Sequence, residues 1–272
     1  MIQVYPIEAS VAAGQKLLLR VNGIGGPFIV RVYRWTTELQ RMGEWAPYRD
    51  GIVSVPTLQE WPSGAYIAQC SEPGTPELRF PDARDGAALF VVRAQRAKVV
   101  MNLPLFTYHA YNCVESGGDC LYTGPKTVSL HRAGGGIGGH PWDEAHPDVY
   151  DTRSPRQTFA HWDAKALAWL CARGYDPAVC CDVDLDAGRL PEDAQLLLTF
   201  GHFEYWTPGM RATIERFLRA GGNVALFSGN TAWFRVHYDP VAHVLSRYGK
   251  WSEVDGEEGL LGTRLLLPLG LG

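Results

Sequence analysis

The chain has 272 residues, a length that permits one large domain or two modest ones with substantial cores, and we expect two. Its net charge of −4 and the lack of a basic block in the sequence argue against a nucleic-acid-binding protein. Since no basic segment precedes an apolar run at the N-terminus and no run could span a bilayer, we expect a cytoplasmic protein without a membrane partner.

Short β-rich runs separated by Gly, Pro and Asn clusters fill the first part of the chain. This pattern is typical of an antiparallel β-unit without long helices. The predicted strands are 16–21, 28–34, 64–70 and 88–93. We therefore predict an immunoglobulin-like β-sandwich over residues 1–94.

From residue 95 onward, predicted strands alternate with predicted helices, which is the pattern of a mostly parallel sheet with crossover helices. The strands are 98–106, 177–183, 195–200 and 223–228, and the helices are 159–173 and 207–220. Thr207 is the expected N-cap of the second helix, with Pro208 in its first turn. Residues 95–272 thus predict an α/β domain that is flavodoxin-like or class I glutamine amidotransferase-like.

The cysteines lack the paired C-x-x-C spacing of a structural zinc site, so we expect free thiols. They are Cys70, Cys113, Cys120, Cys171, Cys180 and Cys181. The vicinal pair falls on a predicted strand and is expected to pack in the core. Cys113 and Cys120 lie in a glycine-containing stretch, 113–158, of a length typical of a functional or a disordered loop, and its position directly after residues 107–112 favours function.

Two strings follow predicted buried strands: Thr-Tyr-His-Ala-Tyr-Asn at 107–112 and Gly-His-Phe-Glu-Tyr-Trp at 201–206. Ligands of open α/β sheets bind beyond the carboxyl ends of the parallel strands, so we expect the strings to form two walls of one pocket. His202 lies two residues before Glu204, and the two would share one face of a regular strand. Taken alone, each tyrosine fits a hydrogen-bonded, half-buried position, and Glu204 fits a cap on the following helix.

Five motifs in order resemble the large (beta) subunit of N,N-dimethylformamidase and its relatives. They are 107–112, Cys-Leu-Tyr at 120–122, Asp-Val-Asp-Leu at 182–185, 201–206, and Gly-Gly-Asn at 221–223 with Ser-Gly-Asn-Thr at 228–231. The N-terminal part is also similar, through Val-Tyr-Arg at 32–34 and Trp-Pro-Ser-Gly-Ala-Tyr at 61–66. Relatives continue well beyond the Ser-Gly-Asn string and supply a further catalytic glutamate there.

The resemblance implies a mononuclear Fe(III) site in the second domain, held by two tyrosinates and one glutamate. Matched by motif, the metal ligands are Tyr111, Tyr122 and Glu204, with Tyr108 as the alternate to Tyr111. His202 matches a residue that assists catalysis without binding metal. Phenolate and carboxylate are hard anionic donors that suit a ferric ion, whose open positions would serve water and the amide carbonyl. The residues expected to line the substrate pocket are Tyr108, Asn112, Trp206 and Asn230.

The sequence therefore predicts an iron-dependent amidohydrolase that cleaves the C–N bond of a small amide or formamide. A small accessory subunit or a second copy of the chain is the expected partner. One alternative is a non-catalytic binding module with a vestigial metal site. The other is a cysteine-dependent, amidotransferase-like hydrolase that uses Cys113 or Cys120 as its nucleophile.

Overall fold

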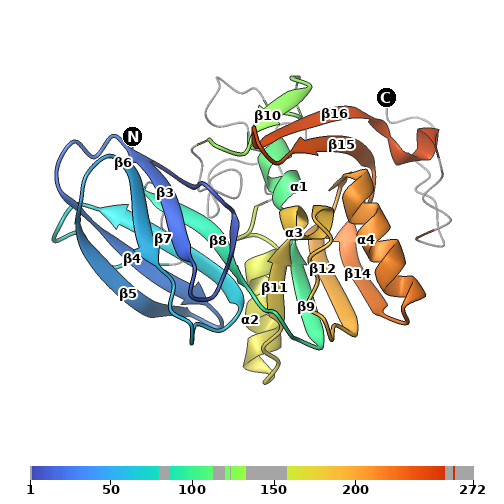
Figure 1. Ribbon diagram of the computed structural model, residues 1–272, viewed down its shortest axis with the longest axis horizontal. Coiled ribbons are helices and arrows are strands. Elements are labelled where there is room, and N and C mark those ends of the chain that lie inside the picture. Colours follow the sequence, from blue (N-terminus) through green and yellow to red (C-terminus); the bar gives the residue numbers. More distant parts are fainter. Residues whose placement is uncertain are drawn as a thin grey trace.

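The computed structural model describes residues 2–79, 86–112, 120–122, 124–132, 158–254 and 260 (Figure 1). Two sheets with a shared apolar core form the N-terminal part. The smaller sheet has the order β1 (Gln3–Pro6), β3 (Lys16–Asn22) and β6 (Gly51–Pro56). The larger has the order β2 (Ser10–Ala12), β8 (Ala87–Arg93), β7 (Gly64–Ser71), β4 (Phe28–Trp35) and β5 (Leu39–Tyr48).

The larger sheet is covered on both faces, which explains why every residue of β4 and β7 is buried. Val30 and Val32 of β4 point into the core shared with the smaller sheet, whereas Tyr33 and Trp35 pack into the core of the remaining chain. Alternate residues of a strand point to opposite faces, so every position of β4 is buried. The indole nitrogen of Trp35 donates to the backbone oxygen of Ala164 at 2.9 Å. The two parts of the chain are therefore packed directly together.

A parallel sheet of four strands forms the centre of the second part, in the order β11 (Ala178–Cys181), β9 (Val99–Leu103), β12 (Leu196–His202) and β14 (Asn223–Gly229). Its longer helices are α2 (Asp163–Ala172) and α4 (Pro208–Arg219). The molecule is thus a mixed α/β protein with several sheets. The immunoglobulin-like and flavodoxin-like or amidotransferase-like assignments stay predictions, as does the domain boundary at residue 94.

A second four-stranded sheet lies across one end of the parallel sheet, above α1 in Figure 1. Its order is β10 (Thr127–Ser129), β16 (Val244–Lys250), β15 (Phe234–Asp239) and β13 (Tyr205–Trp206). The remaining short elements are α1 (Leu105–Ala110), α3 (Asp182–Asp186) and a 3-10 turn at Trp251–Glu253. Within the described ranges, no helix has the length and apolar character needed to cross a membrane.

The predicted helix at 207–220 is confirmed as α4, and its N-cap is confirmed because Thr207 Oγ1 accepts from the Met210 N–H at 3.0 Å. The predicted strand at 98–106 is wrong in its last residues. β9 ends at Leu103, Pro104 is the N-cap residue of α1, and α1 begins at Leu105, so most of the 107–112 string is helical. Pro suits a helix start because it has no N–H to leave unpaired.

Candidate active site

The two strings predicted to form one pocket lie together at the carboxyl ends of β9 and β12. α1 follows β9 directly and carries the first string, while Glu204 lies in the short connection between β12 and β13. The Thr107 hydroxyl oxygen accepts a hydrogen bond from the Glu204 N–H at 3.1 Å. The backbone of the carboxylate residue is therefore held by a side chain of the other string.

Tyr111, Tyr122 and Glu204 form one cluster. The Tyr111 hydroxyl donates to Glu204 Oε2 at 2.7 Å, and the rings of Tyr111 and Tyr122 lie 4.3 Å apart between centroids. The Tyr122 N–H donates to the Ala110 carbonyl at 3.1 Å, which ties the third residue to α1. Tyr111 and Glu204 are 5% and 3% exposed, and Tyr122 is half-buried. The structure thus brings two phenols and one carboxylate into a largely dry environment.

The protonation state of this cluster follows from its burial. Burial raises the pKa of the Tyr111 phenol, and the neighbouring Glu204 carboxylate raises it further. Tyr111 is therefore a neutral phenol that donates its proton toward Glu204. A trivalent cation at the same position would reverse this preference, because it favours phenolate over phenol. The donor set, two phenols and one carboxylate, fits a hard metal ion.

Tyr205 is a fourth member of the cluster that the sequence interpretation missed. Its fully buried ring meets Tyr111 edge-on at 6.3 Å and stacks on Phe234 at 5.0 Å. Its hydroxyl makes no hydrogen bond of regular geometry among the described residues, although the Arg247 side chain lies within reach of it. Burial and Glu204 raise the pKa of Tyr205, while the positive charge of Arg247 lowers it. Nothing in the string itself distinguished this tyrosine from an ordinary strand residue.

Tyr108 makes a different contact from Tyr111. Its hydroxyl donates a short hydrogen bond to Asp163 Oδ2, at the start of α2, and both side chains are buried. Burial raises the pKa of both groups, and the Asp163 charge adds to the effect on Tyr108. The geometry therefore joins Tyr111 to Glu204 and joins Tyr108 to Asp163.

The expectation that His202 and Glu204 share a strand face is wrong, because β12 ends at His202. Gly201 causes the irregularity with a φ of +62°, and a Cβ there would lie 2.7 Å from the Trp162 Cβ. The His202 ring stacks near Trp162, with 6.3 Å between centroids, and its Nε2 lies 3.1 Å from where a Cβ on Gly229 would be. His202 thus lies at the carboxyl end of β12, between Trp162 at the start of α2 and Gly229 of β14.

The remaining residues expected to line the pocket occupy different environments. Trp206 is fully buried, and its indole N–H donates to the Phe203 carbonyl at 2.9 Å. Asn112 is fully buried at the end of α1, and Asn230 follows β14 in a left-handed conformation with φ of +50°. Of the three, Trp206 has the contacts of a core residue.

The expectation that all cysteines are free thiols is wrong for Cys120, which is disulfide-bonded. A disulfide sulfur is not a thiolate nucleophile, so Cys120 does not support the thiol-dependent alternative. Cys113 lies outside the described residues, as does most of the 113–158 stretch. Cys180 and Cys181 are free and buried, and burial raises the pKa of both thiols, as expected for core cysteines.

Within the part of the chain that the structure describes, no three His, Cys, Asp or Glu side chains gather into a group that could hold a metal. The predicted ligand set is of another kind, since Glu204 is its only carboxylate and its other donors are phenols. The candidate centre therefore depends on the tyrosine–glutamate cluster alone.

Asp182, from the Asp-Val-Asp-Leu motif, forms hydrogen bonds to the end of β9 and the start of α1. Its Oδ1 accepts from the Asn102 amide at 2.9 Å and its Oδ2 accepts from the Phe106 N–H at 2.8 Å. The second bond satisfies one of the unpaired N–H groups at the start of α1. The motif thus fixes the helix that carries Tyr111, without contributing a ligand itself.

Because of Asp182, we expect the free energy of unfolding of the protein to fall as pH rises from 3.8 to about 8. Burial raises the pKa of Asp182 to about 8, well above its ordinary value of 3.8. Folded Asp182 therefore keeps its proton where the unfolded chain has lost it. This stabilisation is complete below pH 3.8 and is lost as pH rises through about 8, by at most about 1.4 kcal/mol per pH unit.

Urea unfolding of the wild type and of Asp182→Asn at several pH values measures this slope. The slope should be shallower in the variant. Asp163→Asn serves as a second comparison, because burial shifts the pKa of Asp163 in the same direction. Parallel curves for wild type and Asp182→Asn would show that Asp182 is ionised in the folded protein.

One known family covers most of the chain. The family described as N,N-dimethylformamidase beta subunit-like, C-terminal, matches residues 33–262. The chain therefore belongs to this dimethylformamidase-like family, and membership supports a hydrolase that acts on amide bonds. No curated protein matches the chain.

Proposed function

We propose that this protein is an iron-dependent amidohydrolase that cleaves the C–N bond of a small amide or formamide. The observation that carries the proposal is the hydrogen bond from Tyr111 to Glu204, with Tyr122 packed against it, in a member of a dimethylformamidase-like family. In this proposal Tyr111, Tyr122 and Glu204 are the residues that would hold a mononuclear Fe(III).

The metal, when bound, would supply Lewis acidity toward the amide carbonyl and would lower the pKa of water. The chain contributes a dry setting, because Tyr111 and Glu204 are buried. The Thr107 hydroxyl accepts from the Glu204 N–H, and Asp182 accepts from the N–H of Phe106 at the start of α1. These bonds fix the positions of the 107–112 and 201–206 strings relative to each other. His202, at the carboxyl end of β12, is the group suited to carrying a proton to the leaving amine.

The same proposal extends to assembly. The family is named for a beta subunit, so we propose that a partner subunit or a second copy accompanies this chain. The cytoplasmic location stays a prediction from the sequence. The disulfide at Cys120 weighs against it, since disulfides are rare in the reducing cytosol.

The experiment that tests the function is metal analysis with an optical spectrum of the purified protein. We expect about one iron per chain and a visible phenolate-to-iron absorption band. Tyr122→Phe and Glu204→Gln should each lose the band, and Glu204→Gln should also lose most of the iron. The matched control is Tyr66→Phe, which removes another buried hydroxyl, one bonded to the Pro62 carbonyl at 2.6 Å in the N-terminal part.

If iron is present and its absorption band persists in both Tyr122→Phe and Glu204→Gln, the metal is bound elsewhere than in this cluster. A colourless protein without iron would contradict the proposal and favour the non-catalytic binding module. Retention of iron without hydrolysis across a panel of small amides would favour the vestigial metal site.

A further inference from the structure

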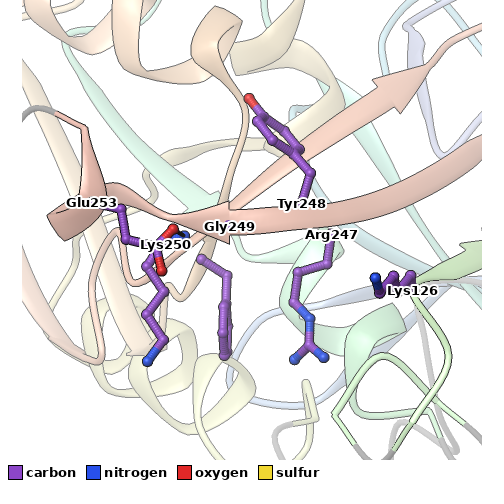
Figure 2. Close-up of a pocket in the computed structure, with 7 residues that line it drawn as sticks. Lys126, Arg247, Tyr248, Gly249, Lys250 and Glu253 are labelled. Carbon is purple, nitrogen blue, oxygen red and sulfur yellow. Dashed lines mark hydrogen bonds between the residues drawn. The ribbon is translucent and has the colours of Figure 1, made fainter.

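A cationic pocket lies beside the tyrosine–glutamate cluster, on the second four-stranded sheet. Its volume is about 370 Å³, and Figure 2 shows the side chains that line it. Three are cations, Lys126, Arg247 and Lys250, while the acidic one is Glu253. Arg247 and Lys250 extend to one side of β16 and Tyr248 extends to the other (Figure 2). The basic groups of the pocket therefore gather in one place, although the chain as a whole is acidic.

The three cations have no carboxylate partner among the described residues. Arg247 lies over the Phe234 ring at 4.8 Å, and the Lys250 ammonium lies over the Trp233 ring at 4.9 Å. Glu253 Oε2 accepts instead from the Lys250 backbone N–H, at 3.0 Å. Positive charge that lies over aromatic rings, as that of Arg247 and Lys250 does, without a carboxylate partner in the described ranges is a feature of sites that receive an anion.

The pocket shares a wall with the candidate metal centre. Phe234 lines the pocket with one part of its surface and stacks on Tyr205 with its ring, at 5.0 Å. The Phe234 N–H also donates to the Glu204 carbonyl at 2.9 Å. Arg247 lies close enough to Tyr205 for its positive charge to act on that phenol. The backbone N–H of Arg247 donates to the Lys126 carbonyl at 2.7 Å. A ligand in this pocket would therefore reach toward the cluster.

We propose that Lys126, Arg247 and Lys250 bind the carboxylate of the substrate, so that the preferred amide is anionic, of the N-formylamino acid class. This inference rests on the proposed function, because it takes the neighbouring cluster as the reaction centre. A planar guanidinium pairs with a carboxylate through two parallel hydrogen bonds, and the ammonium groups add point charges. Water adds across the formyl C–N bond, giving formate and the free amino acid without any oxidant or reductant.

The test compares two substrates that differ only in charge, N-formylglycine and its neutral amide, N-formylglycinamide. In the wild type, kcat/KM for the anionic compound should exceed that for the neutral one by about 10- to 100-fold. Arg247→Gln and Lys126→Met should each reduce this ratio severalfold. The matched control is Lys16→Met, which removes an exposed cation from β3 in the N-terminal part and should leave the ratio as it is.

Binding of the same two compounds, measured by calorimetry, separates this inference from the proposed function. Preferred binding of N-formylglycine that Arg247→Gln abolishes would support the pocket even if neither compound is hydrolysed. Equal binding of the two compounds overturns the inference, and hydrolysis of both would then leave the amidohydrolase standing with a different substrate class.

Discussion

We expect Tyr111→Phe to lower kcat/KM on an amide substrate by at least about a thousandfold, equivalent to about 4 kcal/mol of transition-state stabilisation, and to remove most of the iron. The change deletes only the hydroxyl, which donates to Glu204 at 2.7 Å. The ring packing against Tyr122 can persist, so the variant should fold. Metal content, the optical spectrum and steady-state kinetics of the same preparation measure the effect.

The matched control is Tyr108→Phe, which deletes a hydroxyl three residues away on the same helix. That hydroxyl is bonded to Asp163 rather than to Glu204, so the variant should keep its iron. Its cost should fall on stability instead, about 1 to 3 kcal/mol, because a buried carboxyl loses its partner. If Tyr108→Phe loses the iron while Tyr111→Phe keeps it, the two tyrosines have the opposite assignment.

The sequence was sufficient to predict the elements whose signals are local. α4 has its cap, its proline and its glycine stop within the sixteen consecutive positions 207–222, and the structure has the helix there. The parallel strands β9 and β12 are mostly apolar without regular alternation, as expected for strands buried on both faces. Their pairing brought the two motif strings together, which is why motif order alone predicted one shared site.

The errors came from interactions that are distant in sequence. α1 begins where the predicted strand continued, because Asp182 accepts the Phe106 N–H from a position 76 residues further along the chain. A prediction from the periodicity of apolar residues cannot include a hydrogen bond to a residue so distant in sequence. The break after His202 likewise depends on Trp162, which packs against Gly201 from another element. Regular strand geometry was the wrong basis for relating His202 to Glu204.

Tyr205 illustrates the limit for functional residues. Alternation in a strand would turn it away from Glu204, its neighbour in sequence. Glu204 lies outside the strands, however, and β13 begins at Tyr205, so both residues face the same cluster. The cationic pocket was also invisible, since Lys126 and Arg247 meet only through the pairing of β10 with β16. Both features depend on tertiary pairing that no motif in the sequence encodes.

Trp206→Ala should destabilise the protein by about 3 to 5 kcal/mol, a large share of the roughly 5 to 15 kcal/mol available to a domain. Trp206 has no exposed surface, its indole N–H is bonded to the Phe203 carbonyl, and its ring packs on Phe203 at 4.6 Å between centroids. Alanine would leave a cavity and an unpaired carbonyl. Denaturant unfolding of the variant measures the loss.

Trp169→Ala is the matched control, because that indole is 53% exposed on α2, where it stacks under Arg173. Its effect should stay within about 0.5 kcal/mol. The comparison also decides between two roles for Trp206. A pocket wall would raise KM with little change in stability, whereas a core residue supports β13 and its pairing with β15. Trp206 is a core residue if Trp206→Ala loses stability while the milder Trp206→Phe keeps the wild-type KM. An altered KM in a fully stable variant would instead show that Trp206 lines the pocket.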